Sequence, residues 1–315
     1  MALSLKNIWQ IVQQSFKDFG ELKVIRMGAA LAFYTIFSIA PTLIVIITLC
    51  DIFFGRQAIE GSIYAQINSF VGSDAAMEIQ TLIKNASISK DISWASAIGI
   101  VALVFAATSI FAEIQDSINY IWRLKAKPAK GWLKLIFNRL LSFSMVVTLG
   151  FVLMVSLVIN ALMDALVDRL VELFPQIAVY AAYGINLLLT FVTTSFLFGI
   201  IFKVLPDAKI QWKDVRVGAF TTAGLFMLGK FAIGFYLGKS HISSSYGAAG
   251  SLIIILLWVY YSSIILYFGA TFTKAYAQHT GSHIYPSDYA VWIQQVEMES
   301  NTSLQQQDTA VIEKT

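Results

Sequence analysis

Six long runs of hydrophobic residues alternate with polar segments along the chain. Each run is at least 20 residues long. The hydrocarbon core of a bilayer is about 30 Å thick and a helix rises about 1.5 Å per residue, so each run can form one transmembrane helix. Polarity does not alternate within the runs, which argues against membrane β-strands. The runs are 28–50, 95–114, 140–163, 177–202, 217–237 and 248–272.

The overall composition leads to the same fold class. Hydrophobic residues make up 57% of the 315 residues, and charged residues make up 13%. Soluble domains carry about 25% charged residues, so this chain cannot cover a water-facing surface. The high apolar content also excludes a disordered chain. The sequence therefore predicts an all-α, polytopic membrane protein with six transmembrane helices.

Lysine and arginine are distributed unequally between the two sets of loops. Sixteen lie in the terminal segments and in the loops after the second and fourth runs, and five lie in the other loops. The positive-inside rule then places both termini in the cytoplasm, as an even number of spans also requires. The first outer loop, 51–92, carries apolar residues at helical spacing, which predicts short periplasmic amphipathic helices.

The segments on either side of the six runs differ in character. Within 1–27, apolar residues fall on one helical face and lysines lie off it, which predicts a cytoplasmic interfacial helix. The transmembrane domain is predicted to cover 28–276. The remaining residues, 277–315, read as a polar cytoplasmic tail with a disordered end. The net charge of +3 is too small to indicate nucleic-acid binding.

Lys230 is one of only two charged residues inside the runs. A charge at this depth costs about 2.5 to 3.5 kcal/mol on insertion scales, so it normally faces the bundle interior. It either anchors an anionic substrate or extends outward toward Asp164 or Asp168. We favour the first role because Gly229 and Gly234 leave space beside the lysine.

Five further residues complete the candidate substrate path. Glu113 and Asp116, three residues apart, could share a proton or hold a cation, although pairing with the six basic residues of the next loop is the favoured interpretation. Pro41 frees a backbone carbonyl in the first run and lies after Tyr34; such a kink serves either a path or a plain bend. Tyr246 precedes the sixth run.

The remaining residues bear on two questions: which helices pack closely, and whether the sequence holds a catalytic or metal site. Gly234 and Gly238 form a GxxxG pair, which we expect to pack inside the chain rather than in a dimer. Motifs for phosphate binding, zinc hydrolysis and serine catalysis are absent from the sequence. His279 and His283 lack an adjacent acidic ligand, and Cys50 is the single cysteine. We expect no enzyme activity, no cofactor and no metal.

Three separated motifs carry a resemblance to a known family. The first is GAALAFYT at 28–35, followed by Ser38 and Pro41. The second is SIFAEIQD at 109–116, followed by Asn119 and Ile121-Trp122. The third is YGAAGS at 246–251, which leads to LWVYYS at 257–262 and to Gly269-Ala270. Together they resemble the YihY / virulence factor BrkB family of bacterial inner-membrane proteins.

The resemblance implies six spans and a multi-pass location in the bacterial inner membrane. Proposed roles in the family concern the envelope, including transport of lipid or lipopolysaccharide. The glutamate that commonly follows the Gly-Ala pair of the last span is Thr271 here, so its role cannot be carried over. The older label of the family, ribonuclease BN, is rejected. A hydrolytic nuclease needs clustered metal ligands or a histidine acid and base, whereas the three histidines here fall on both sides of the membrane.

We therefore expect a protein that transports or handles an amphiphilic, lipid-like, anionic envelope molecule. The expected partners are membrane lipids and this substrate, without nucleic acid. A homo-oligomer is left open. The alternatives are a non-transporting envelope scaffold and, less favoured, a membrane enzyme.

Overall fold

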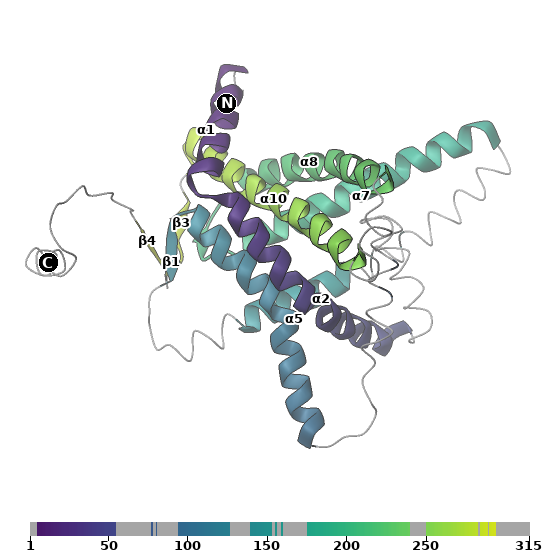
Figure 1. Cartoon of the computed structure of the whole chain (residues 1–315). Helices are drawn as coiled ribbons and strands as arrows, with labels where there is room; N and C mark the ends of the chain where they lie inside the picture. The colour runs from purple at the N-terminus through teal and green to yellow at the C-terminus, as the bar shows by residue number, and fades with distance from the viewer. Residues whose placement is uncertain are drawn as a thin grey trace, which may run out of the picture.

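The chain is described by a computed structural model, which is mostly helical (Figure 1). The described residues are 5–54, 77, 80, 94–126, 139–152, 155, 159, 175–239, 250–282, 284–288 and 290–293.

Each of the six predicted runs overlaps a helix. The third run begins in the helix Arg139–Val152. The other five correspond to α2 (Val24–Phe54), α5 (Trp94–Ile121), α7 (Pro175–Val204), α8 (Trp212–Lys239) and α10 (Gly250–His279). The predicted N-terminal amphipathic helix is α1 (Leu5–Glu21).

The described helices differ in whether they can cross a membrane. Three are long and apolar enough within the described residues: Tyr183–Val204, Trp212–Tyr236 and Leu252–His279. A fourth candidate is the bent pair Lys6–Glu21 and Val24–Ile39, whose axes differ by 66°. The helix Arg139–Val152 is apolar but shorter. The structure thus shows a helical membrane protein with three or four candidate spans, and the count of six stays a prediction.

The bend between α1 and α2 has a local cause. Lys23 adopts a left-handed conformation with a φ of 53°. The amide of Leu22 donates to the carbonyl of Asp18 at 3.0 Å, and the amide of Lys23 donates to that of Gly20 at 3.1 Å. A left-handed residue of this kind commonly ends a helix. As a result α1 turns away from α2 and lies along α10 (Figure 1).

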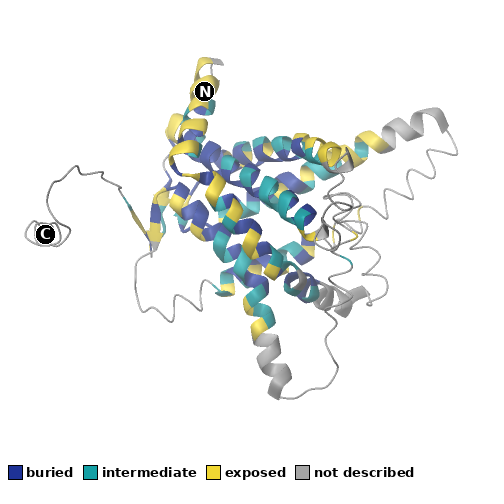
Figure 2. Cartoon of the chain, in the orientation of Figure 1, coloured by how far each residue is buried: buried dark blue, intermediate teal, exposed yellow. Residues whose placement is uncertain are grey.

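The core forms around α10, which packs against α1, α2, α5 and α8. Buried residues gather where these helices cross, and exposed residues lie on the outer faces (Figure 2). Many of the exposed residues are large and apolar, such as Phe37, Leu228 and Phe235. Such a surface suits a lipid environment rather than water.

Two glycine–threonine pairs hold α8 against α10. The side chain of Thr273 fills the space at Gly218, and that of Thr222 fills the space at Gly269. Thr222 also donates to the carbonyl of Gly218, and Thr273 to that of Gly269, each at 2.7 Å. The two pairs are therefore reciprocal, and only residues without a Cβ fit at the two glycine positions.

Gly234 has no described atom within 4 Å of the position of a Cβ, so the packing of the predicted GxxxG pair stays a prediction. Among the described glycines, a Cβ would overlap a partner helix at Gly218, Gly229 and Gly269, and would be tightly placed against Ile264 at Gly28. The side-chain surroundings of Gly238, the other member of the predicted GxxxG pair, lie outside the described residues. The GxxxG spacing therefore did not identify the glycines that lie at the contact between α8 and α10.

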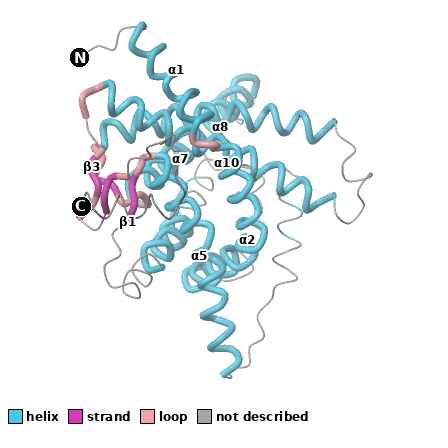
Figure 3. The backbone as a smooth tube through the Cα atoms, turned by 60° about the vertical axis from the view of Figure 1, so that its left-hand side comes forward, coloured by secondary structure: helices cyan, strands magenta, loops and turns pink. Residues whose placement is uncertain are grey.

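Two small antiparallel sheets, not expected in an all-α chain, join loops to the segment after α10 (Figure 3). β1 (Leu124–Ala126) pairs with β4 (Ala290–Trp292). β2 (Ala208–Lys209) pairs with β3 (Tyr285–Pro286). Part of the predicted polar tail is therefore folded onto the loops that follow α5 and α7.

Several predictions fall on residues that the structure does not describe. In the first outer loop the described residues are 51–54, which end α2, together with Met77 and Gln80, which are helical. Tyr246, Asp164, Asp168 and the end of the predicted tail, 301–315, also lie outside the described residues.

Candidate functional site

A cavity of about 550 Å³ lies between α1, α8 and α10, and we call it the α1 groove. Aliphatic and aromatic side chains from these three helices form almost all of its wall. The lining residues are Val12, Phe16, Phe19, Thr221, Leu225, Leu228, Gly229, Ala232, Tyr261, Ile264, Ile265, Phe268 and Phe272. Two of the three helices that form it, α8 and α10, contain candidate membrane spans.

The position of α1 over the groove follows from three stripes along the helix. Ile11, Ser15 and Asp18 form the buried stripe that faces α10. On one side of it, Phe16 and Phe19 contact the ring of Phe268, with centroids 5.0 and 6.0 Å away. This apolar flank forms one wall of the groove.

The opposite flank of α1 is polar and borders a separate hollow of about 320 Å³. This hollow is lined by Gln10, Gln13, Gln14, Lys17 and His279. One helix therefore separates an apolar groove from a polar hollow, as expected for a helix at a membrane–water boundary.

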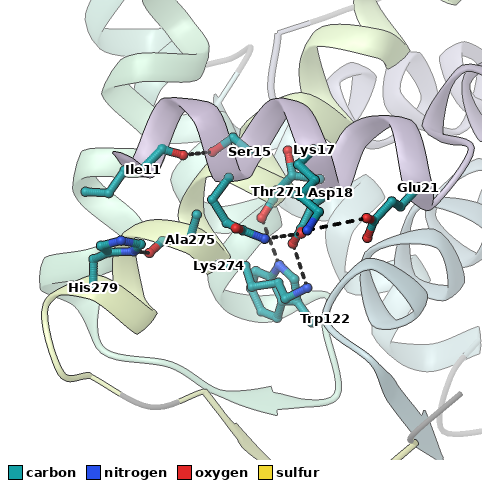
Figure 4. A network of polar contacts seen from close by, with 12 residues as sticks. Ile11, Ser15, Lys17, Asp18, Glu21, Trp122, Thr271, Lys274, Ala275 and His279 are labelled. Carbon is teal, nitrogen blue, oxygen red and sulfur yellow. Dashed lines mark hydrogen bonds and ion pairs between the residues drawn. The ribbon is translucent and has the colours of Figure 1, made fainter. Parts of the chain in front are cut away.

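A buried ion pair fixes α1 on α10 (Figure 4). The Nζ of Lys274 lies 2.9 Å from Oδ2 of Asp18, and the two side chains expose only 8% and 7% of their surfaces. Gln14 donates a second hydrogen bond to Asp18 at 2.7 Å. Lys274 lies two residues beyond the end of the sixth apolar run, 248–272, but inside α10.

The end of α5 is joined to the same region of α10. The indole Nε1 of Trp122 donates to the carbonyl of Ala270 at 3.0 Å. Thr271, which occupies the position of the family's usual glutamate, is fully buried beside the ion pair and donates to the carbonyl of Phe268 at 2.7 Å (Figure 4). Thr271 is thus a neutral residue satisfied within its own helix.

A second apolar cavity, of about 420 Å³, lies among α2, α5, α7, α8 and α10 and also touches the helix Arg139–Val152. Its few polar side chains are Thr35, Ser262 and Ser263. All three hydroxyls donate to carbonyls one turn earlier in their own helices: Thr35 to Leu31 at 2.8 Å, Ser262 to Trp258 at 2.9 Å and Ser263 to Val259 at 2.6 Å. The cavity consequently presents an almost wholly apolar wall.

The described path candidates lie on three helices, α2, α5 and α8, and their joint role stays a prediction. Lys230 is half-buried on α8 and lines neither apolar cavity, although it is not without a partner. The space expected at Gly229 is filled by the hydroxyl of Tyr261, whereas no described atom lies near a Cβ at Gly234. Tyr34 lies on the exposed surface of α2, with its ring 6.2 Å from that of Phe33.

The other three described path candidates lie on α2 and α5. Pro41 lies within α2, which continues to Phe54. The next residue, Thr42, donates to the carbonyls of Ser38 at 2.6 Å and Ala107 of α5 at 3.1 Å, so this part of α2 is tied to α5. Glu113 and Asp116 lie one turn apart on α5, on the C-terminal side of the contact between Thr42 and Ala107.

Sequence analysis missed a buried network centred on Asp207, in the loop after α7. Gln115 donates to Oδ1 of Asp207 at 2.9 Å, and Asn119 donates to Oδ2 at 3.0 Å. The amide of Asp207 returns a hydrogen bond to Oδ1 of Asn119 at 2.8 Å. Both donors belong to the second motif, so this motif serves to hold the α7 loop against α5. The only signal in the sequence was the motif itself, because the partner lies 88 and 92 residues away.

Comparison with known proteins agrees with these motifs. The family model described as Virulence factor BrkB matches residues 15–288. A UPF0761 membrane protein of Haemophilus influenzae is 28% identical over 273 residues, which cover 85% of this chain and 94% of the relative. One from Pseudoalteromonas atlantica is 28% identical over 246 residues, with 77% and 78% covered.

A longer relative, from Saccharophagus degradans, is 26% identical over 279 residues, and the chain spans 60% of its length. No solved structure matches the chain. The family match extends from within α1 to just after β3 and includes all three sequence motifs. This protein is therefore a member of the Virulence factor BrkB family of membrane proteins.

Proposed function

We propose that the protein transports or handles an amphiphilic, anionic, lipid-like molecule of the bacterial envelope, and that it does so in the inner membrane. The observation that carries the proposal is the α1 groove. Its volume of about 550 Å³ falls in the usual range for small-molecule sites, about 300 to 1,000 Å³. An apolar wall between candidate spans suits an acyl chain, which would enter it directly from the bilayer.

Charges around α1 support the anionic part of the proposal. Lys17 borders the polar hollow, and Lys23 and Arg26 are exposed at the bend into α2. A basic residue near a membrane surface attracts anionic headgroups by about 1 kcal/mol. An amphiphile with its tail in the groove would therefore find cations close to the end of α1. This combination favours the lipid role over a scaffold, which needs no groove. No catalytic role is part of the proposal.

Filling the groove tests the proposal. We expect Ala232→Trp to weaken binding of a fluorescent-acyl phosphatidylglycerol to the purified protein by about tenfold, because the indole would occupy the space for the tail. Ala29→Trp is the matched control. Ala29 is also exposed on an apolar helix, but it does not line the groove.

Equal binding by the two tryptophan variants would count against the α1 groove as the lipid site. A liposome assay with the same lipid then separates movement from binding. Wild-type binding without translocation would favour the non-transporting scaffold.

We also propose the six-span topology with both termini in the cytoplasm. The β1–β4 and β2–β3 pairs place the loops after α5 and α7 beside the segment after α10, and the Asp18–Lys274 pair brings α1 to the same end. Segments that touch in this way share one side of a membrane. This arrangement supports the topology that the lysine and arginine bias predicts.

Cysteine labelling tests the topology. In a Cys50→Ser background, we expect Lys127→Cys and Lys209→Cys to be protected from a membrane-impermeant maleimide in intact spheroplasts and to react after permeabilisation. Lys84→Cys, in the predicted outer loop, is the control that should react in both conditions. Labelling of Lys209→Cys in intact spheroplasts would overturn the predicted orientation.

A further inference from the structure

Tyr267 of α10 is fully buried, and among the described residues its hydroxyl oxygen has no hydrogen bond of normal geometry. Its nearby polar group is the side chain of Ser117 on α5, and the carboxylates of Glu113 and Asp116 are close enough to interact with it electrostatically. A buried polar group without a partner costs free energy, and one common explanation is a bound ion that completes its hydrogen-bonding or coordination shell.

Glu113 supplies a charge at this place. It is half-buried, and its Oε1 lies 3.5 Å from the Oγ of Ser117, which is itself buried. Among the described residues, Glu113 has no ion-pair partner. A half-buried carboxylate in an apolar helix bundle is costly unless it is protonated or a positive charge compensates it.

The neighbouring carboxylate, by contrast, has a cation close by. Arg139 attracts Asp116 electrostatically. The guanidinium is held in place by a hydrogen bond to Thr108 at 3.3 Å, and it lies 3.6 Å from the ring centroid of Phe105. Arg139 therefore offsets the negative charge of Asp116, whereas among the described residues no cation pairs with Glu113.

From this geometry we propose that Glu113, Ser117 and Tyr267 bind a small monovalent metal cation such as Na⁺ between α5 and α10. A carboxylate and two hydroxyls are the hard oxygen ligands that such ions prefer. One positive charge balances the one carboxylate that Arg139 does not offset, which argues against a divalent ion. The site does not depend on the lipid role and can be tested without any lipid.

Thermal unfolding of the purified full-length protein in detergent tests the site. The titration replaces choline chloride with NaCl at constant ionic strength and pH. We expect the Tm of the wild type to rise saturably with Na⁺. Glu113→Gln should abolish this rise, because it removes the charge but keeps the shape. Tyr267→Phe should raise the Na⁺ concentration at half-effect about tenfold, because it removes one ligand.

Two control variants accompany the titration. Glu21→Gln removes an exposed carboxylate on α1, and Ser109→Ala removes a hydroxyl on α5 that bonds the carbonyl of Ala106. Both should keep the wild-type response. If Glu113→Gln does not fold, Tyr267→Phe still decides the matter through its Na⁺ dependence.

The proposal is overturned if Na⁺ and choline stabilise the wild type equally, or if Glu113→Gln keeps the Na⁺ response. It is also overturned if lowering the pH alone stabilises the protein and Na⁺ adds nothing. That result would assign the compensating charge to a proton on Glu113.

Discussion

Replacing Lys274 with methionine should lower the free energy of unfolding by about 3 to 5 kcal/mol. Removing one partner of a buried ion pair leaves the other charge buried and uncompensated, which is the costly part. In this protein the stranded group would be Asp18, with Gln14 as its remaining hydrogen-bond donor. Thermal unfolding in detergent, followed by circular dichroism or by intrinsic tryptophan fluorescence, measures the change.

Lys17→Met is the matched control on α1. Lys17 pairs with Glu21 at 3.8 Å, but both side chains are more than half exposed. Such pairs contribute about 0.3 to 0.5 kcal/mol, so this variant should unfold close to the wild type. The double variant Asp18→Leu/Lys274→Met should recover much of the loss, since it strands no charge. If Lys274→Met were as stable as Lys17→Met, the ion pair would not hold α1.

Gly269→Val should be the other strongly destabilising substitution. Its Cβ would overlap the side chain of Thr222, so α8 and α10 would have to separate. Overpacking a close contact costs about 1 to 3 kcal/mol, and a shifted helix pair would place the effect at the upper end. The expected result is a clear fall in Tm and in the yield of folded protein from the membrane.

The control for this substitution is Gly224→Val on α8, where no atom lies within 4 Å of the new Cβ. Adding Thr222→Gly to Gly269→Val should restore part of the stability, because it removes the side chain that overlaps. Equal effects of valine at Gly224 and Gly269 would mean that the loss reflects helix propensity and not the contact.

The helices could be predicted because their signal is local. A run such as 177–202 is apolar enough to define α7 without knowledge of any partner. The end of α10 could not be placed in the same way. The apolar run stops at Phe272, but the helix continues to His279, and Lys274 inside it pairs with Asp18, 256 residues away. A local pattern cannot contain that information.

In the candidate site, too, local features could be predicted and contacts between distant residues could not. The amphipathic character of α1 was visible in the sequence, whereas the α1 groove needs three helices to come together. The sequence predicted free space beside Gly229, but in the structure Tyr261 of α10 occupies that space. Nothing in the sequence around Asp207 indicated that its carboxylate accepts hydrogen bonds from Gln115 and Asn119. The short strands could not be predicted from the sequence, because two or three residues are too few to show an alternating pattern.

The two strand pairs also set an order of events during synthesis. Residues 124–126 and 208–209 are made well before their partners at 285–292, and Asp18 is made long before Lys274. A growing chain emerges from its N-terminal end first. The early helices must therefore enter the membrane while the loops after α5 and α7 are still unpaired and the carboxylate of Asp18 still lacks its cation. Residues 274–292, made after every helix that they join, lock this end of the bundle.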